Sequence, residues 1–89
     1  MVPEPHPCVR IRYWAGAKAA AGVAEEDVAA TTPREALAEV RRRRADPAFD
    51  RVLEACSILI DGRAAHEDDL DRPIKGLVVL ELLPPFAGG

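Results

Sequence analysis

The residues of this sequence best suited to chemistry are Gly88 and Gly89, the two glycines that close it. A glycine carboxylate is a competent nucleophile toward ATP, and the acyl adenylate that forms can be attacked by sulfide or a persulfide. Because glycine has no Cβ atom, such an end can also thread a narrow channel in a partner enzyme. We therefore predict that the carboxylate of Gly89 is activated and loaded with sulfur, and that a partner supplies the catalytic groups.

The residues just before these glycines suit the same use. Pro84 and Pro85 cannot donate to a strand ladder and favour an extended backbone, so they should direct the tail, residues 84–89, away from the body of the protein. Phe86 would be an apolar anchor in the partner's pocket, and Ala87 leaves room for a channel to narrow. The alternative interpretation is that the final glycines are incidental, as in a frayed end or a linker.

The strands that must position this tail follow from the hydrophobic pattern. Residues 8–14 alternate with a period of two, which places Val9, Ile11 and Tyr13 on one face of a strand. Further β-branched and apolar runs end at turn signals or prolines. Four strands are predicted: 8–14, 23–30, 56–60 and 77–83.

One main helix is predicted from a local capping signal. Thr32 can cap it, Pro33 suits its first position, and Glu35 lies where a capping box requires an acidic residue. The helix should end near residue 45, because the residue before Pro47 is disfavoured in the helical conformation. The remaining segments are predicted as a short helix at 15–21, one further helical turn within 48–55, and a long connection with little regular structure at 63–76.

Together these elements predict an α+β fold with a sheet of about four strands on one main helix. Residues 1–7 contain three prolines and are predicted to be a disordered arm. The folded domain is expected to span residues 8–83, with the reactive tail at 84–89.

The last predicted strand is apolar on both faces except at Glu81, which suggests a second role for it. Alternate residues should face the helix, and the others should lie on the open face of the sheet. The helix-facing set is Val78, Leu80 and Leu82, and the open-face set is Leu77, Val79 and Leu83. Large apolar residues on an open face indicate a protein-binding patch, with Leu77 and Val79 as its candidate residues. The alternative is that neighbouring loops simply cover these two edge residues.

Composition narrows the possible functions. Twelve basic and fifteen acidic residues give a net charge of −3, which opposes nucleic-acid binding, and the basic run 41–44 is interpreted as a solvated helix face. No apolar run is long enough for a transmembrane helix, so no membrane role is predicted. Cys8 and Cys56 are too few for a disulfide framework, and without an export signal we expect a cytoplasmic protein. His6 and His66 lie far apart in the sequence, so no metal site is predicted.

Over residues 9–89 the sequence resembles the MoaD/ThiS family of ubiquitin-like sulfur carriers, small β-grasp proteins that end in Gly-Gly. The resemblance depends on the final segment 83–89 (Leu-Pro-Pro-Phe-Ala-Gly-Gly), on the first strand leading into the alanine-rich segment 13–22, and on Ile60-Asp61-Gly62. The sequence is most similar to the MoaD branch, the small subunit of molybdopterin synthase. The resemblance implies a ubiquitin-like β-grasp fold, that is, a mixed sheet in which the first and last strands pair in parallel at the centre, with everything between them as the crossover.

The resemblance also implies partners. Gly89 would be adenylated by a MoeB-like enzyme that consumes ATP, converted to a thiocarboxylate, and inserted into a MoaE-like large subunit, in a heterotetramer where it donates sulfur for molybdopterin synthesis. The chain itself would bind no cofactor and catalyse nothing alone. Two alternatives stay open: a sulfur carrier for another pathway, of the thiamin or cysteine type, and a ubiquitin-like modifier joined to other proteins through Gly89.

Overall fold

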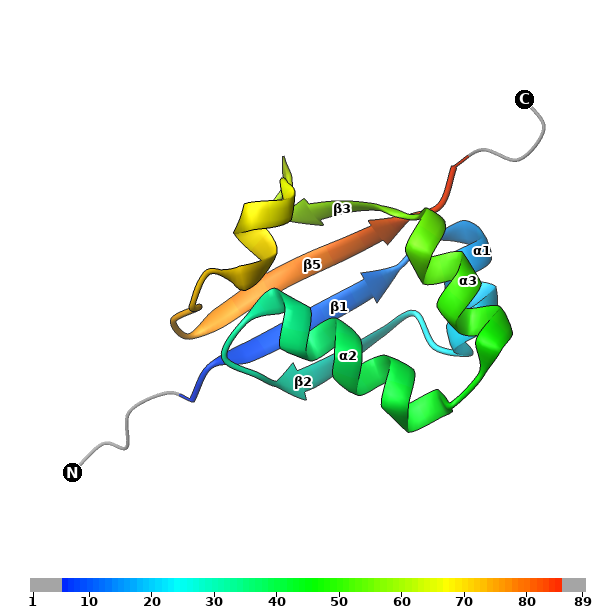
Figure 1. Ribbon diagram of the computed structural model, residues 1–89, viewed down its shortest axis with the longest axis horizontal. Helices are drawn as coiled ribbons and strands as arrows, with labels where there is room; N and C mark the ends of the chain where they lie inside the picture. The colour runs from blue at the N-terminus through cyan, green and yellow to red at the C-terminus, as the bar shows by residue number, and fades with distance from the viewer. Residues whose placement is uncertain (1–5, 86–89) are drawn as a thin grey trace.

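The computed structural model describes residues 6–85, in which strands and helices follow one another as Figure 1 shows. The strands are β1 (Cys8–Tyr13), β2 (Glu25–Ala29), β3 (Ser57–Ile60), β4 (Arg63–Ala64) and β5 (Leu77–Leu83). The helices are α1 (Ala15–Ala21), α2 (Pro33–Arg44), α3 (Pro47–Ala55) and the short 3-10 helix η1 (Glu67–Asp71). Within the described part of the chain, no helix combines the length and the apolar character needed to cross a membrane.

The strands form one mixed sheet in the order β2-β1-β5-β3-β4 (Figure 1). β1 and β5 pair in parallel at its centre, from Cys8 opposite Leu77 to Tyr13 opposite Leu82, which confirms the predicted central pair. The prediction of about four strands omits β4, which is only two residues long. It exists because Asp61 and Gly62 both have positive φ, as a tight hairpin turn requires.

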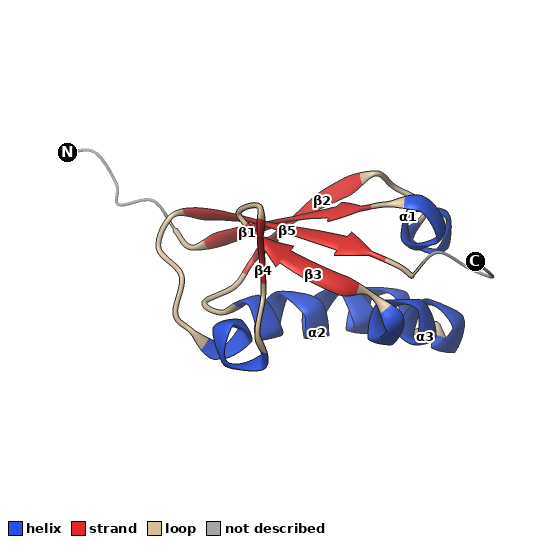
Figure 2. Cartoon of the chain, turned by 90° about the horizontal axis from the view of Figure 1, so that it is seen from above, coloured by secondary structure: helices blue, strands red, loops and turns tan. Residues whose placement is uncertain are grey.

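The helices pack on one face of the sheet, and none of those described covers the other (Figure 2). Figure 2 shows α2 and α3 lying along this face, while α1 lies beside the ends of the strands. The core fills the space between the two layers. Its largest fully buried side chains are Phe49, Ile11, Leu80, Leu82, Val9, Val28, Val40 and Pro33. The predicted alternation of the first strand is confirmed, because Val9, Ile11 and Tyr13 are all buried.

Helix α2 begins at the predicted residue and ends within one residue of the predicted end. The Thr32 hydroxyl accepts a hydrogen bond from the Glu35 N–H at 3.1 Å, and Pro33 is the first helical residue. The Glu35 carboxylate accepts from the hydroxyl and the N–H of Thr31, not from the N–H of Thr32. The capping interaction is therefore reciprocal, but its return bond lies one residue earlier than a standard capping box.

The segment 48–55 lies in a full helix, so the prediction of a single turn there is wrong. Helix α3 has nine residues, with Pro47 in its first turn, and the Asp46 carboxylate caps it by accepting from the Ala48 N–H at 2.9 Å. A proline disfavours helix in the residue before it and favours helix start at its own position. Asp46 and Pro47 therefore separate two helices, and α3 brings Phe49 into the core.

The connection 63–76 also contains more regular structure than predicted. Besides β4 it holds η1, whose Leu70 is buried. Arg34 of α2 ties η1 to the main helix, because its guanidinium donates to Asp71 at 2.7 Å and to Glu67 at 2.8 Å. These partners are far from Arg34 in sequence, so a local pattern could not reveal them.

The prediction of a solvated face for the basic run 41–44 is wrong for Arg44, whose side chain is only 18% exposed. Its guanidinium donates to the Glu26 carboxylate at 2.6 Å and stands over the rings of Phe49 and Tyr13, at 4.6 and 5.5 Å from their centroids. The Tyr13 hydroxyl donates to the same carboxylate at 2.7 Å. Arg44 is only partly exposed because of a tertiary contact: β2 brings Glu26 over the end of α2.

This cluster fixes the charge state of Glu26. Burial acts to raise the pKa of Glu26, but the hydrogen bonds from Tyr13 and Arg44, with the charges of Arg44 and Arg43, outweigh it and lower this pKa below its ordinary value. Burial, and then the hydrogen bond to Glu26, raises the pKa of Tyr13. At neutral pH Glu26 is therefore ionised and Tyr13 is a protonated donor.

Glu26→Gln should therefore destabilise the protein in a pH-dependent way. A carboxyl with a lowered folded pKa stabilises the fold above its ordinary pKa of about 4.3, and this contribution is lost as the pH falls through the lower folded value. We expect the variant to lose about 1–2 kcal/mol of unfolding free energy at pH 7, as for a hydrogen-bonded charge, and the difference to shrink as the pH falls below that ordinary value. Urea unfolding followed by circular dichroism measures both.

The control is Glu25→Gln, because the pair of Glu25 with Arg12 spans 3.7 Å and both side chains are about half exposed. This variant should change the unfolding free energy by less than about 0.5 kcal/mol. A loss in Glu26→Gln that is the same at pH 3 and pH 7 would contradict the proposed role of the ionised carboxylate.

Candidate functional site

The candidate site begins at the C-terminal end of β5, where the predicted tail starts. Strands β1 and β3 flank β5 here: the Trp14 N–H donates to the Leu82 carbonyl at 3.2 Å, and Leu83 pairs with Ser57. Pro84 is half-buried and Pro85 is exposed. Because both neighbouring strands hold the end of β5, the point at which the tail leaves the sheet is fixed.

The reactive part of the predicted tail lies outside the described residues. Gly88 and Gly89, predicted as the reactive end, and Phe86 and Ala87, predicted as partner contacts, are all in this part, so their roles stay predictions. Within the described range, the structure brings Pro84 and Pro85 to one end of the sheet, and Leu77 and Val79 to its open face.

The open face carries an apolar stripe along β5 that is interrupted at Glu81. Leu77 is 50% exposed, and Val79 and Leu83 are half-buried, whereas Leu80 and Leu82 are buried against the helices. This confirms which residues of the last strand face the helices and which do not. The covering by loops that the sequence left open does not occur for Leu77 within the described residues.

Sheet pairing adds residues to this face that the sequence pattern did not indicate. Leu59 pairs with Glu81 and therefore lies on the face of Val79, and Cys8 pairs with Leu77. Both are half-buried. Alternation in the third strand places Leu59 opposite to Ile58 and Ile60, but only the register of β3 on β5 shows that this side is the open one.

Charged residues border the stripe along β1 and β2. Arg10 donates to Asp27 at 2.9 Å, and this hydrogen bond lowers the pKa of Asp27 and raises that of Arg10. Arg12 lies 3.7 Å from the Glu25 carboxylate and 4.0 Å from that of Glu81. Since these charges are already paired, a partner could bury the apolar stripe without leaving a charge unpaired.

Trp14 is a further exposed residue near the tail exit that sequence reasoning missed. Its side chain is 43% exposed, and the Arg12 guanidinium stands 5.3 Å from the centroid of its ring. Its backbone bond to Leu82 places it beside the end of β5. Exposed tryptophan is enriched in protein interfaces, so Trp14 extends the candidate surface toward the tail.

The described residues offer little chemistry of their own. Among residues 6–85, no group of three or more His, Cys, Asp or Glu side chains is arranged to hold a metal ion. The Cys56 thiol donates to the Val52 carbonyl at 3.2 Å, and burial raises its pKa, which disfavours the reactive thiolate. The arrangement can therefore present a tail and an apolar face to a partner.

Comparison with protein-family models and with curated protein sequences found no match. Solved structures do match. The small archaeal modifier protein 1 from Methanosarcina acetivorans has a TM-score of 0.77 at 22% identity, over 93% of this chain and 97% of that one. The modifier of the same name from Haloferax volcanii has a TM-score of 0.73 at 25% identity, over 92% and 99%. A chain in the complex of subunits 1 and 2 of the molybdopterin-converting factor from Helicobacter pylori has a TM-score of 0.65 at 22% identity, over 92% and 99%.

The chain therefore has the ubiquitin-like β-grasp fold that these modifier and molybdopterin-converting proteins share. This confirms the fold that the sequence resemblance to MoaD/ThiS proteins implies. The match extends over nearly all of this chain and of each similar structure, so no large part of the fold is left over on either side.

Proposed function

We propose that this protein is a sulfur carrier that acts through the carboxylate of Gly89. The observation that carries the proposal is the placement of β5: it lies at the centre of a β-grasp sheet, has an apolar open face, and leads directly into Pro84, Pro85 and the glycine-ended tail. As part of the same proposal, the protein acts in the cytoplasm.

The proposed chemistry has two steps. The Gly89 carboxylate attacks the α-phosphate of ATP in a MoeB-like enzyme, which releases pyrophosphate and leaves an acyl adenylate. A sulfide donor then attacks the acyl carbon, and AMP leaves to give the thiocarboxylate. A persulfide donor would instead give an acyl disulfide, which a second thiol of the partner reduces to the thiocarboxylate as a protein disulfide forms. The chain contributes the carboxylate and the docking surface, while the ATP and the catalytic groups belong to the partner.

The acceptor proposed first is the molybdopterin precursor, bound by a MoaE-like large subunit. The similarity to a complex of two molybdopterin-converting subunits supports a large-subunit partner, and the stripe of Leu77, Val79 and Leu83 is a suitable docking surface for it. A heterotetramer of two small and two large subunits is part of this proposal. A thiamin- or cysteine-type pathway would use the same tail chemistry with another acceptor.

A protein modifier is the second candidate, because archaeal modifiers are among the solved structures that match this chain. Two archaeal modifiers have TM-scores of 0.77 and 0.73 with this chain, and chains of two molybdopterin-converting factors have 0.71 and 0.65, so the similarity of fold supports both candidates. In this case the activated Gly89 would be attacked by a lysine amine, which gives an isopeptide bond in place of a thiocarboxylate.

Intact-mass spectrometry tests the first proposal. The chain is incubated with a MoeB-like enzyme, ATP and a sulfide donor, with a known carrier of that enzyme as the positive control. We expect a mass increase equal to the difference between sulfur and oxygen, and no increase in a variant that lacks Gly89. An unchanged mass in the full chain, while the known carrier is loaded, would reject the proposal.

The modifier is tested separately in cell extract. High-molecular-mass adducts of an N-terminally tagged chain that disappear when Gly89 is deleted would favour conjugation. Sulfur transfer to the molybdopterin precursor, measured with a MoaE-like subunit and the thiocarboxylated chain, would favour the carrier.

A further inference from the structure

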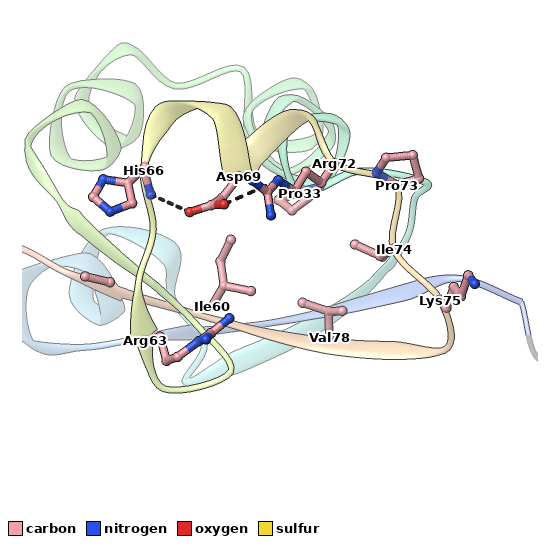
Figure 3. Close-up of a pocket in the computed structure, with 11 residues that line it drawn as sticks. Pro33, Ile60, Arg63, His66, Asp69, Arg72, Pro73, Ile74, Lys75 and Val78 are labelled. Carbon is pink, nitrogen blue, oxygen red and sulfur yellow. Dashed lines mark hydrogen bonds and ion pairs between the residues drawn. The ribbon is translucent and has the colours of Figure 1, made fainter.

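A cavity of about 520 Å³ lies at the end of the sheet where β5 begins, far along the strand from the tail exit (Figure 3). Its floor is the helix-facing side of the sheet edge, formed by Ile60 and Val78, and Ile74 closes it from the side. Figure 3 shows η1 and the following loop above this floor. The volume falls in the range of about 300–1,000 Å³ that is usual for small-molecule sites.

The roof of the cavity is held in place by contacts outside it. The Ile74 N–H donates to the Thr31 carbonyl at 2.9 Å, which fixes the loop to the start of α2. Arg34 holds η1 through Asp71 and Glu67 at 2.7 and 2.8 Å. The cavity is therefore formed in the free chain, and a ligand need not order the loop before it binds.

Positive charge dominates the rim. Arg63, Arg72 and Lys75 line the cavity together with His66, against a single carboxylate, Asp69. That carboxylate already has partners in the protein. It accepts a hydrogen bond from the backbone N–H of His66 at 2.8 Å and lies 3.6 Å from the Arg72 guanidinium. The hydrogen bond from His66, and then the charges of Arg72 and Arg63, lower the pKa of Asp69, so it is ionised and already paired at neutral pH.

Two of the cations remain for a ligand. Within residues 6–85, neither Arg63 nor Lys75 forms an ion pair with a protein carboxylate. A concentration of unpaired positive charge is notable in a chain whose net charge is −3. Arg63 can donate to an anionic group through two N–H groups, and Lys75 adds positive charge at the other end of the rim (Figure 3).

We propose that this cavity binds a small organic anion, that is, a carboxylate or phosphate attached to an apolar group of about one ring. The apolar floor of Ile60, Ile74 and Val78 accommodates the ring, Arg63 binds the anion, and Lys75 adds to the positive potential of the rim. A simple inorganic anion would leave the floor unused. The site lies at the opposite end of β5 from the tail, so ligand binding there is separate from the chemistry proposed for Gly89.

Methyl NMR of the full chain tests this with phenyl phosphate as the probe. The chain has four isoleucines, of which Ile60 and Ile74 line the cavity, whereas Ile11 and Ile58 do not. We expect saturable shifts of the Ile60 and Ile74 δ1 methyls with a dissociation constant of a few millimolar or tighter, and no shift of the other two. Equal shifts of all four, or none up to about 10 mM, would overturn the proposal, given the binding energy expected of a ligand this small.

Two double variants with matched charge reversals distinguish the effect of the rim cations on binding from the effect of the protein's net charge. Arg63→Glu with Lys75→Glu should raise the dissociation constant at least about tenfold, as expected for lost hydrogen bonds to a charged group. Arg51→Glu with Lys18→Glu changes the same residue types at exposed positions outside the cavity and should change it less than twofold. Equal weakening by the two double variants would overturn the proposal, and so would inorganic phosphate that shifts Ile60 and Ile74 as strongly as phenyl phosphate.

Discussion

Replacing Val79 with glutamate is expected to weaken binding to a MoaE-like large subunit by at least about thirtyfold, the loss typical of a central interface residue. Val79 lies in the middle of the apolar stripe, so docking would bury the new carboxylate against apolar surface. In the free chain the same carboxylate stays in water on the open face, opposite Arg10 of β1. We therefore expect a stability loss of only about 1 kcal/mol or less, because sheet substitutions span about that range.

Val23→Glu is the matched control for this result. Val23 is 43% exposed and precedes β2, outside the open-face stripe, so the same substitution should change partner affinity less than twofold. Isothermal titration calorimetry gives the affinities, and urea unfolding gives the stability of each variant. If Val79→Glu loses stability in proportion to affinity, or if Val23→Glu weakens binding as much, the stripe is not the docking surface.

The two central strands were predictable because their pattern is local. Burial of one face imposes a period of two, so Val9 and Ile11 of the first strand and Leu80 and Leu82 of the last could be assigned to the core from their spacing alone. The parallel pairing of these strands then followed from the family resemblance and the order of elements. The open-face positions, including Val79, came from the same alternation.

The missed features depend on contacts between distant segments. The pairing of Arg44 with Glu26 requires β2 to lie over the end of α2. The position of η1 requires the contacts of Arg34 with Glu67 and Asp71. A basic run and an acidic connection are each usually solvated, and nothing in their own sequence separates these cases from that common one.

The candidate site was predicted in the same uneven way. Leu77 and Val79 could be predicted from the alternation of one strand. Leu59 could be placed only from the register of β3 on β5, and Trp14 only from its backbone hydrogen bond to Leu82 of β5. The cavity beneath η1 could not be foreseen, because it forms only when the stretch 60–78 folds back on itself against Pro33 of α2. The chemistry of Gly89, in contrast, is a prediction from the sequence, because Gly89 lies outside the described residues.

Phe49→Ala is expected to lower the free energy of unfolding by about 3–5 kcal/mol, the usual range for removing a buried aromatic ring. Phe49 is fully buried, packs edge-on against Tyr13 at 5.9 Å, and lies under the Arg44 guanidinium at 4.6 Å. Its loss would leave a cavity and also expose Arg44 and Glu26 to rearrangement. Since small domains have about 5–15 kcal/mol in total, the variant should be folded only marginally at 25 °C.

Two variants on the same helix separate packing from helix propensity. Arg51→Ala changes an exposed position of α3 and should alter stability by no more than about 0.5 kcal/mol. Phe49→Leu keeps much of the apolar volume and should lose clearly less than Phe49→Ala. Urea unfolding followed by the fluorescence of the single tryptophan, Trp14, gives all three values. A loss below about 1.5 kcal/mol for Phe49→Ala, well under the expected range for a buried ring, would show that α3 contributes little to the core, as a single irregular turn would.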